Sequence, residues 1–229
     1  MKLDPYFRKF NHGKMTFSLM YAYSENFILV LSHDEVVHLK CSMLGKMPGD
    51  REDKFANLKL AYAYMCGHPG KKLLFMGQEF GQWNEWSEKR ALDWYLLEDD
   101  SHKELKDFTK ACLILNKKYR CLYETDYSPE GFRWINANDK DNSVFSFIRI
   151  SPDKKRHLLF VFNFTPVERP NHRIGVPVKG KYKLVLGDDM KNQKKTLTSV
   201  RGECDGYKES LLIDLHRYGI AVYEFNGDV

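Results

Sequence analysis

The chain has 229 residues, 43% of them hydrophobic, which is enough for one large domain or two smaller ones with buried cores. Its formal charge of +5 comes from 36 basic and 31 acidic residues spread along the chain, without the basic blocks typical of nucleic-acid-binding proteins. No apolar run approaches the roughly 20 residues of a membrane helix, and residues 1–10 lack an apolar signal region. Five cysteines without metal-ligand spacing fit reduced thiols better than a disulfide framework. We therefore expect a cytoplasmic protein with neither nucleic acid nor a membrane as its partner.

A short apolar run ends in a polar cluster early in the chain. Residues Phe27–Leu31 are consecutive apolar residues and predict a strand buried on both faces, as in a parallel sheet covered by helices. His33, Asp34 and Glu35 follow directly. In α/β barrels the carboxyl ends of the strands carry the catalytic residues, so this cluster is the candidate active site.

The next segments alternate helix and strand. Asp50 is a predicted N-cap, and the apolar residues that follow recur at three-four spacing up to a stop at residues 67–70. Lys72–Met76 reads as a second short buried strand, which completes a β–α–β unit. After a loop rich in tryptophan, an amphipathic pattern predicts another helix over Ser101–Arg120.

After residue 123 the hydrophobic residues recur with a period of two. Short β-rich runs separated by turn signals predict an antiparallel sandwich. These runs are Phe132–Ile135, Val144–Ile150, Leu158–Phe164, Tyr182–Leu186, Leu211–Leu215 and Ile220–Phe225. We place the boundary between two domains, residues 1–121 and residues 122–229, at this change of pattern.

Taken by themselves, the residues of the polar cluster favour two interpretations equally. Asp34 could stabilise a developing positive charge while His33 binds sugar hydroxyls, as an oxocarbenium-like transition state requires. Alternatively, His33 and Glu35 cap the loop and Asp34 binds backbone amides. Trp83 in the downstream loop could stack on a sugar ring, although loop tryptophans are as often structural anchors.

Several motifs together resemble the last part of glycogen branching enzymes, the 1,4-α-glucan branching enzymes of the α-amylase superfamily. The motifs are LSHDEVVH from Leu31, LGKMPGD from Leu44, KFANLKLAYAYM from Lys54, GHPGKKLLFMGQEFGQWNEW from Gly67 and LDWYLL from Leu92. The similarity covers nearly the whole chain, with weaker matches at Asn163–Val167 and Tyr218–Phe225. It implies that residues 1–121 are the C-terminal portion of a (β/α)8 TIM barrel, with strands like the seventh and eighth, followed by an α-amylase-type β-sandwich.

The resemblance also implies an activity and its residues. Branching enzymes cut an α-1,4-glucan through a covalent glycosyl-enzyme and transfer the piece to a 6-hydroxyl, forming an α-1,6 branch. Asp34 corresponds to their transition-state stabiliser and His33 to a catalytic-site histidine in the donor subsite, with Glu35 and Trp83 as further substrate-binding candidates. No cofactor or metal is implied.

The family's nucleophile and acid/base lie on the fourth and fifth barrel strands, which this sequence does not contain. A whole barrel of this kind takes about 250 residues. We therefore expect the isolated chain to be inactive, with an N-terminal catalytic portion and an α-1,4-glucan as its partners. The alternatives are a non-catalytic glucan-binding or structural module derived from such an enzyme, and another amylase-type enzyme.

One residue departs from the family pattern close to the candidate site. Branching enzymes usually read VVHGK where this chain has Val37, His38, Leu39 and Lys40. Leu39 replaces a glycine, and the exchange would strain the loop if that position needs a positive φ.

Overall fold

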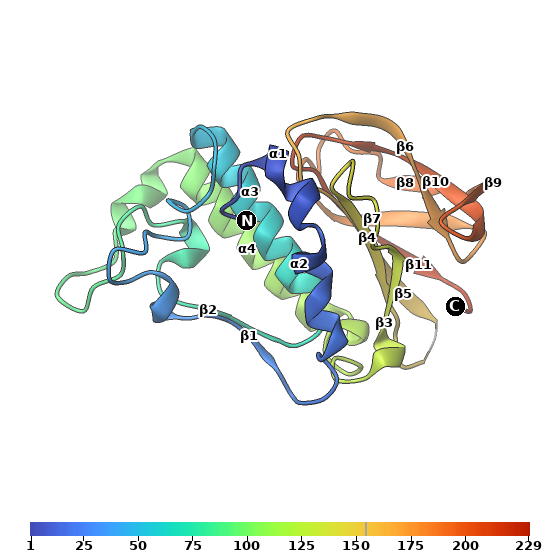
Figure 1. Cartoon of the computed structure of the whole chain (residues 1–229), viewed down its shortest axis with the longest axis horizontal. Helices are drawn as coiled ribbons and strands as arrows, with labels where there is room; N and C mark the ends of the chain where they lie inside the picture. The colour runs from blue at the N-terminus through green and yellow to red at the C-terminus, as the bar shows by residue number, and fades with distance from the viewer. Residues whose placement is uncertain (154) are drawn as a thin grey trace.

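The computed structural model describes residues 1–153 and 155–229, and in it two long helices lie between a pair of strands and a β-sandwich (Figure 1). The helices are α1 (Pro5–Arg8), α2 (Gly13–Thr16), α3 (Arg51–Gly67) and α4 (Asp100–Lys118). The strands are β1 (Ile28–Leu31), β2 (Lys71–Leu74), β3 (Phe132–Asn136), β4 (Val144–Arg149), β5 (Arg156–Asn163), β6 (Arg169–Val176), β7 (Lys181–Gly187), β8 (Thr196–Thr198), β9 (Val200–Cys204), β10 (Tyr207–Leu215) and β11 (Ile220–Asn226). No helix among the described residues is both long and apolar enough to cross a membrane.

The antiparallel sandwich that the period-two pattern predicts is confirmed. One sheet has the strand order β3-β4-β5-β11-β7-β8, and the other has the order β6-β10-β9. Aliphatic side chains from both sheets, among them Ile148, Leu159 and Leu211, form the core between them. Three strands escaped the sequence analysis, namely β6, β8 and β9. Each is short or largely polar with few buried residues, because an edge strand faces solvent.

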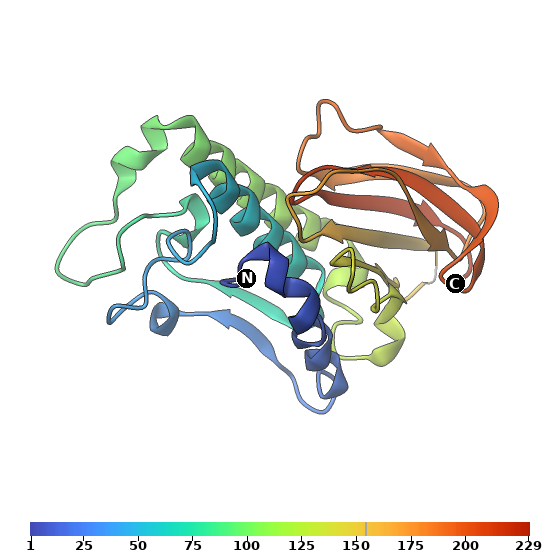
Figure 2. The same cartoon turned by 45° about the horizontal axis from the view of Figure 1, so that its top comes forward.

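Helices α3 and α4 cover the other face of the six-stranded sheet (Figure 2). Leu60 and Tyr64 of α3 and Leu115 of α4 pack there with Phe147 and Phe160 of the sheet. Gly67, at the end of α3, approaches the sheet so closely that a Cβ atom would lie 2.8 Å from the Phe160 ring. The predicted boundary near residue 121 therefore falls inside one shared core.

Helix α3 begins where the sequence predicts. The Asp50 carboxylate accepts a hydrogen bond from the Asp53 amide at 2.9 Å, as an N-cap does. The buried surface of α3 is larger than the single apolar face that the sequence predicts. Leu58 and Tyr62 pack in a further cluster with Phe55 and Leu105, on the side away from the sandwich. The helix is buried on two sides because it lies between two layers.

Strands β1 and β2 form a parallel pair joined through α3, as the predicted β–α–β unit requires. The expectation that both strands are buried on both faces is wrong for this chain. Exposed and half-buried side chains alternate along each strand, and Ile28 and Val30 are 54% and 49% exposed. The physical reason is that these strands pair only with each other among the described residues, and α3 lies on one side of them (Figure 1). The described residues contain no closed barrel.

A buried arginine of the sandwich forms an ion pair and also contacts the end of α3. The Arg149 guanidinium of β4 donates to the Asp126 carboxylate at 2.9 Å and to the Gly67 carbonyl at 2.8 Å, and both charged side chains are fully buried. Burial alone would raise the pKa of Asp126, but the Lys72 and Arg149 cations beside it hold that pKa below its usual value. Asp126 is therefore ionised and balances the buried charge of Arg149.

Replacement of Asp126 by asparagine tests this pair. Asp126→Asn keeps the side-chain shape but leaves the Arg149 charge without its counter-ion, so we expect the free energy of unfolding to fall by about 3–5 kcal/mol. Urea unfolding followed by tryptophan fluorescence measures the change. Glu124→Gln, which removes an exposed partner of Arg120, is the control and should have little effect. Equal effects of the two variants would contradict the role of the buried pair.

Candidate functional site

His33, Asp34 and Glu35 form a 3₁₀ turn directly after β1, at the carboxyl end of the strand. The Ser32 hydroxyl accepts a hydrogen bond from the Asp34 amide at 3.3 Å, and the Val36 amide donates to the His33 carbonyl at 2.9 Å. The serine and the turn hydrogen bond explain why the strand stops here and the chain reverses. The turn leaves the His33 and Asp34 side chains open to solvent, with 55% and 72% of their surfaces exposed.

The side chains of His33 and Asp34 lie next to each other. His33 Nε2 is 3.4 Å from Asp34 Oδ1, and the His33 ring is 5.9 Å from the Phe75 ring after β2. Among the described residues, the Asp34 carboxylate has no ion-pair partner besides His33. An exposed carboxylate beside an imidazole can face a positively charged transition state, while the imidazole contacts a hydroxyl.

Glu35 is held differently from its two neighbours. The ammonium group of Lys46, which is almost fully buried, lies 3.4 Å from Glu35 Oε2 and also donates to the Glu35 backbone carbonyl. Glu35 is one of the residues that line a cavity of about 440 Å³ between β1, α3 and the N-terminal helices. His33 and Asp34 do not line this cavity. Glu35 is thus paired with Lys46, whereas the His33 and Asp34 side chains lie against each other.

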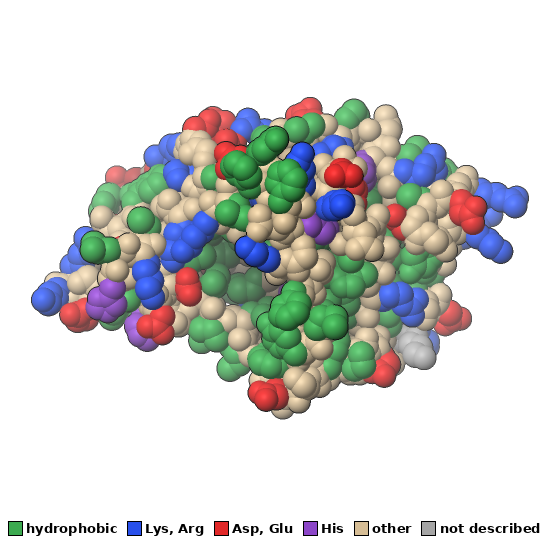
Figure 3. Space-filling model, viewed as in Figure 1, with side chains coloured by type: hydrophobic (Ala, Val, Ile, Leu, Met, Phe, Trp, Pro, Cys, Tyr) green, Lys and Arg blue, Asp and Glu red, His purple; other side chains and the backbone are tan. Residues whose placement is uncertain are grey.

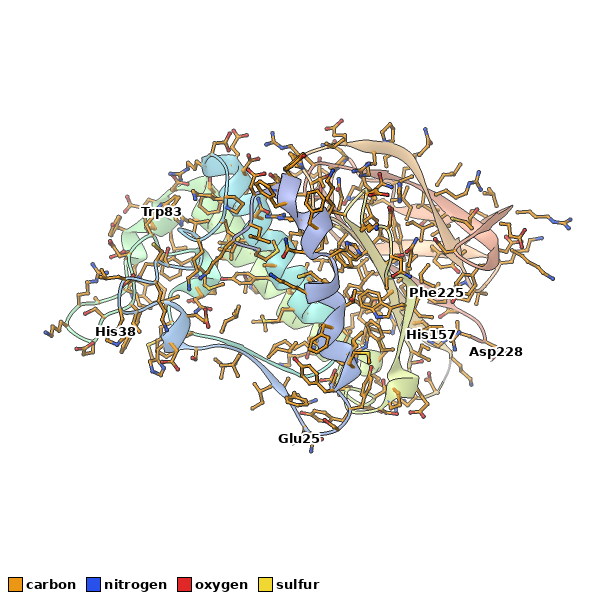
Figure 4. All side chains as sticks on the ribbon, viewed as in Figure 1. Glu25, His38, Trp83, His157, Phe225 and Asp228 are labelled. Atoms are coloured by element: carbon orange, nitrogen blue, oxygen red, sulfur yellow. The ribbon has the colours of Figure 1, made fainter. Side chains whose placement is uncertain are left out.

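Trp83 and Trp86 of the downstream loop both contact aromatic rings of the helical layer or of the segment after β2. Trp83 is partly buried, with its ring 6.2 Å from Phe55 and 6.0 Å from His102. Figure 4 shows Trp83 and His38 at the same end of the molecule, on the side away from the sandwich. The ring of Trp86, another tryptophan of the same loop, lies 5.2 Å from the Phe75 ring, which in turn lies 5.9 Å from the His33 ring.

The loop that follows the turn has an unusual backbone. His38, Leu39 and Cys41 all have positive φ, at 57°, 64° and 65°, and the Leu39 side chain is 95% exposed. The sequence analysis pointed to Leu39 as a replaced glycine that would be strained at positive φ. The structure places it in that conformation, so the leucine contributes strain without packing.

Three charged residues near the site were not among the candidates of the sequence analysis. They are Lys40, Lys46 and Glu85, whose side chains all contact the backbone of residues 34–41. Charged residues in loops are common, and only the tertiary contacts distinguish these three from the rest. Over residues 1–153 and 155–229, no group of three or more His, Cys, Asp or Glu side chains is arranged to hold a metal ion.

Comparison with known proteins first identifies the family of the sandwich domain. Residues 134–226 match the family described as alpha amylase, C-terminal all-beta domain. Among solved structures, the debranching enzyme from Nostoc punctiforme aligns with 86% of this chain and 35% of its own, with a TM-score of 0.57 at 14% sequence identity. A likeness at that identity establishes the fold alone. The C-terminal half of the chain is therefore an α-amylase-type all-β domain.

Closer relatives extend over the rest of the chain. The 1,4-alpha-glucan branching enzyme GlgB of Butyrivibrio fibrisolvens is 51% identical over 232 residues, which cover 98% of this chain and 36% of that protein. The enzyme of the same name from Aquifex aeolicus is 50% identical over 188 residues, covering 82% of this chain and 30% of its own length. The chain belongs to the family of 1,4-α-glucan branching enzymes. It spans about a third of the length of the curated relatives it matches.

The strained loop gives a direct test of the local geometry. Leu39→Gly should raise the free energy of unfolding by about 1 kcal/mol, because glycine adopts positive φ without the steric cost that leucine pays. Thermal unfolding of the two proteins, followed by circular dichroism, measures the change. Leu113→Gly, at an exposed position within helix α4, is the control and should instead cost about 1 kcal/mol. A destabilising effect of Leu39→Gly would argue against the positive φ.

Proposed function

We propose that this chain is the C-terminal part of a 1,4-α-glucan branching enzyme, in which Asp34 stabilises the transition state and His33 binds the donor sugar. The observation that carries the proposal is the exposed His33–Asp34 pair at the carboxyl end of β1, in a chain 51% identical to a branching enzyme. On this proposal β1 and β2 are the seventh and eighth strands of a (β/α)8 barrel. Residues 1–121 then belong to the barrel and residues 122–229 form the C-terminal sandwich, in a cytoplasmic enzyme.

The proposed chemistry is a retaining transfer between glucose units. When the bond to C1 of the donor sugar breaks, positive charge develops on C1 and the ring oxygen, and a nearby carboxylate stabilises it. Asp34 would supply that carboxylate, and its exposed position leaves room for a sugar ring. His33, 3.4 Å away, would donate to a hydroxyl of the same sugar and keep Asp34 oriented. The 6-hydroxyl of an acceptor glucan would then attack C1 of the glycosyl-enzyme, release the enzyme's carboxylate and complete the α-1,6 branch.

Asp34 alone does not complete this mechanism. A retaining transfer needs a nucleophile and an acid/base whose carboxyl groups are about 5 Å apart. On the family resemblance, both come from barrel strands that this sequence does not include. We propose that a polypeptide carrying those strands supplies them, and that the isolated chain does not branch glucan.

The exposed apolar surface supports this view of an additional polypeptide. Phe17, Met20 and Tyr21 are 63%, 82% and 46% exposed, and the Tyr21 ring lies 5.6 Å from that of Phe27, the residue before β1, where Ile28 and Val30 are also exposed. Figure 3 shows apolar side chains gathered over this region of the molecule. Exposed apolar surface of this extent is typical of an interface. A barrel remainder seated against β1 would cover it.

Mixing experiments test the proposal. The purified chain alone should not change the iodine stain of amylose, whereas the chain mixed with a separately expressed N-terminal portion of a complete branching enzyme should lower it. In the mixture Asp34→Asn should reduce the branching rate at least about 100-fold, because it removes the charge that faces the transition state. Asp107→Asn, an exposed position on α4, is the matched control and should retain full activity.

Each other outcome has a defined meaning. Branching by the chain alone would overturn the proposed need for a second polypeptide. A chain that binds maltooligosaccharide but never branches, even in the mixture, would favour the alternative of a non-catalytic glucan-binding module. A fully active Asp34→Asn variant would exclude Asp34 as the stabilising carboxylate.

A further inference from the structure

The backbone of residues 36–41 is held by the side chain and backbone of a dipeptide from another loop. Glu85 Oε2 accepts a hydrogen bond from the Leu39 amide at 3.0 Å, and Glu85 Oε1 accepts one from the Cys41 amide at 2.7 Å. The Trp86 amide donates to the Val36 carbonyl at 3.0 Å. Glu85 and Trp86 thus fix both ends of the loop, and we refer to these three contacts as the clasp.

The clasp stabilises the positive-φ backbone of this loop. Backbone amides of a turn that includes left-handed residues can form a concave site for an anion. Leu39 and Cys41 are two such residues, and the Glu85 carboxylate occupies the site with one oxygen on each amide. Hydrogen bonds to an ionised acceptor are roughly twice as strong as neutral ones, so they offset the strain of the left-handed backbone.

Lys40 connects the clasp to the candidate catalytic turn. It lies between the two amides that Glu85 holds, and its ammonium group donates to the Asp34 backbone carbonyl at 2.7 Å. The contacts therefore run from Glu85 to the loop backbone, from the loop to the Lys40 side chain, and from Lys40 to the residue that carries the carboxylate. Trp86 adds a second path, because its ring packs on Phe75, which lies against His33.

We propose that Glu85 is a positioning residue, which fixes the loop after the His33–Asp34 turn and, through Lys40, sets the orientation of Asp34. The catalytic part of this inference rests on the proposed function, whereas the mechanical part concerns the chain alone. Glu85 acts at a distance from the sugar, since its carboxylate is engaged by two backbone amides. Loss of Glu85 should lower the rate of the chemical step more than it weakens glucan binding.

Amide hydrogen exchange, resolved by nuclear magnetic resonance, tests the mechanical part on the isolated chain. In Glu85→Gln the Leu39 and Cys41 amides should exchange at least about tenfold faster, the factor expected for the loss of a charge-assisted hydrogen bond. Glu88→Gln, an exposed position in the same loop, is the matched control and should leave both amides unchanged. Equal exchange rates of these amides in the two variants would contradict the proposed hydrogen bonds of the clasp.

Lys40 provides a second variant that spares the clasp. Lys40→Met should leave the Leu39 and Cys41 amides protected but shift the resonances of His33 and Asp34, while Lys40→Arg should restore them. Unchanged His33 and Asp34 resonances in Lys40→Met would overturn the connection to the turn. This result stays informative even if Glu85→Gln fails to fold.

Activity in the mixture with an N-terminal portion tests the catalytic part. Glu85→Gln should lower kcat about tenfold with little change in KM. Addition of Leu39→Gly to Glu85→Gln should recover part of the loss, because glycine needs no carboxylate to hold its positive φ. An unchanged kcat would overturn the positioning role. If the unsubstituted chain is inactive in the mixture, the proposed function fails, and amide exchange still decides whether the clasp exists.

Discussion

The buried guanidinium of Arg149 holds the helical layer against the sandwich, and the arrangement of the remaining parts depends on it. An arginine stays charged in any protein environment, so its burial is tolerated only with a counter-ion and with acceptors for its N–H groups. Asp126 supplies the charge, and the carbonyls of Gly67 and Gly131 accept from the other nitrogens. These partners come from the end of α3 and from the segment that leads into β3. The guanidinium therefore fixes the end of the helix relative to the six-stranded sheet.

The same cluster extends to the strand pair that carries the candidate site. Lys72 of β2 donates to the carbonyls of His68 and Gly70, and burial lowers the pKa of its ammonium group to about 8, although the Asp126 charge opposes that shift. Lys71 donates its amide to the Phe27 carbonyl just before β1. The helix end thus sets the start of β2, and β2 sets the register of β1. The turn at His33 takes its position from this sequence of contacts.

At the other end of β1 the candidate catalytic turn is braced from two directions. Lys46 holds Glu35 from the interior, and the clasp of Glu85 and Trp86 holds the following loop from outside. Both braces act on backbone atoms or on Glu35, so the side chains of His33 and Asp34 remain free. This division is what a preorganised site requires, because rigid support must not occupy the groups that meet the substrate.

The sequence by itself determined the local elements. The N-cap at Asp50, the helices α3 and α4, and the six predicted sandwich strands follow from short-range chemistry and are confirmed by the structure. The location of His33 and Asp34 after a strand also follows from local pattern, whereas their catalytic roles stay predictions. Only the tertiary structure decided that α3 is buried on two sides, that β1 and β2 each expose one face, and that Glu85 and Lys40 brace the site. Contacts between residues 39 and 85 or between 126 and 149 depend on how layers pack, and neither periodicity nor propensity encodes such distant pairs.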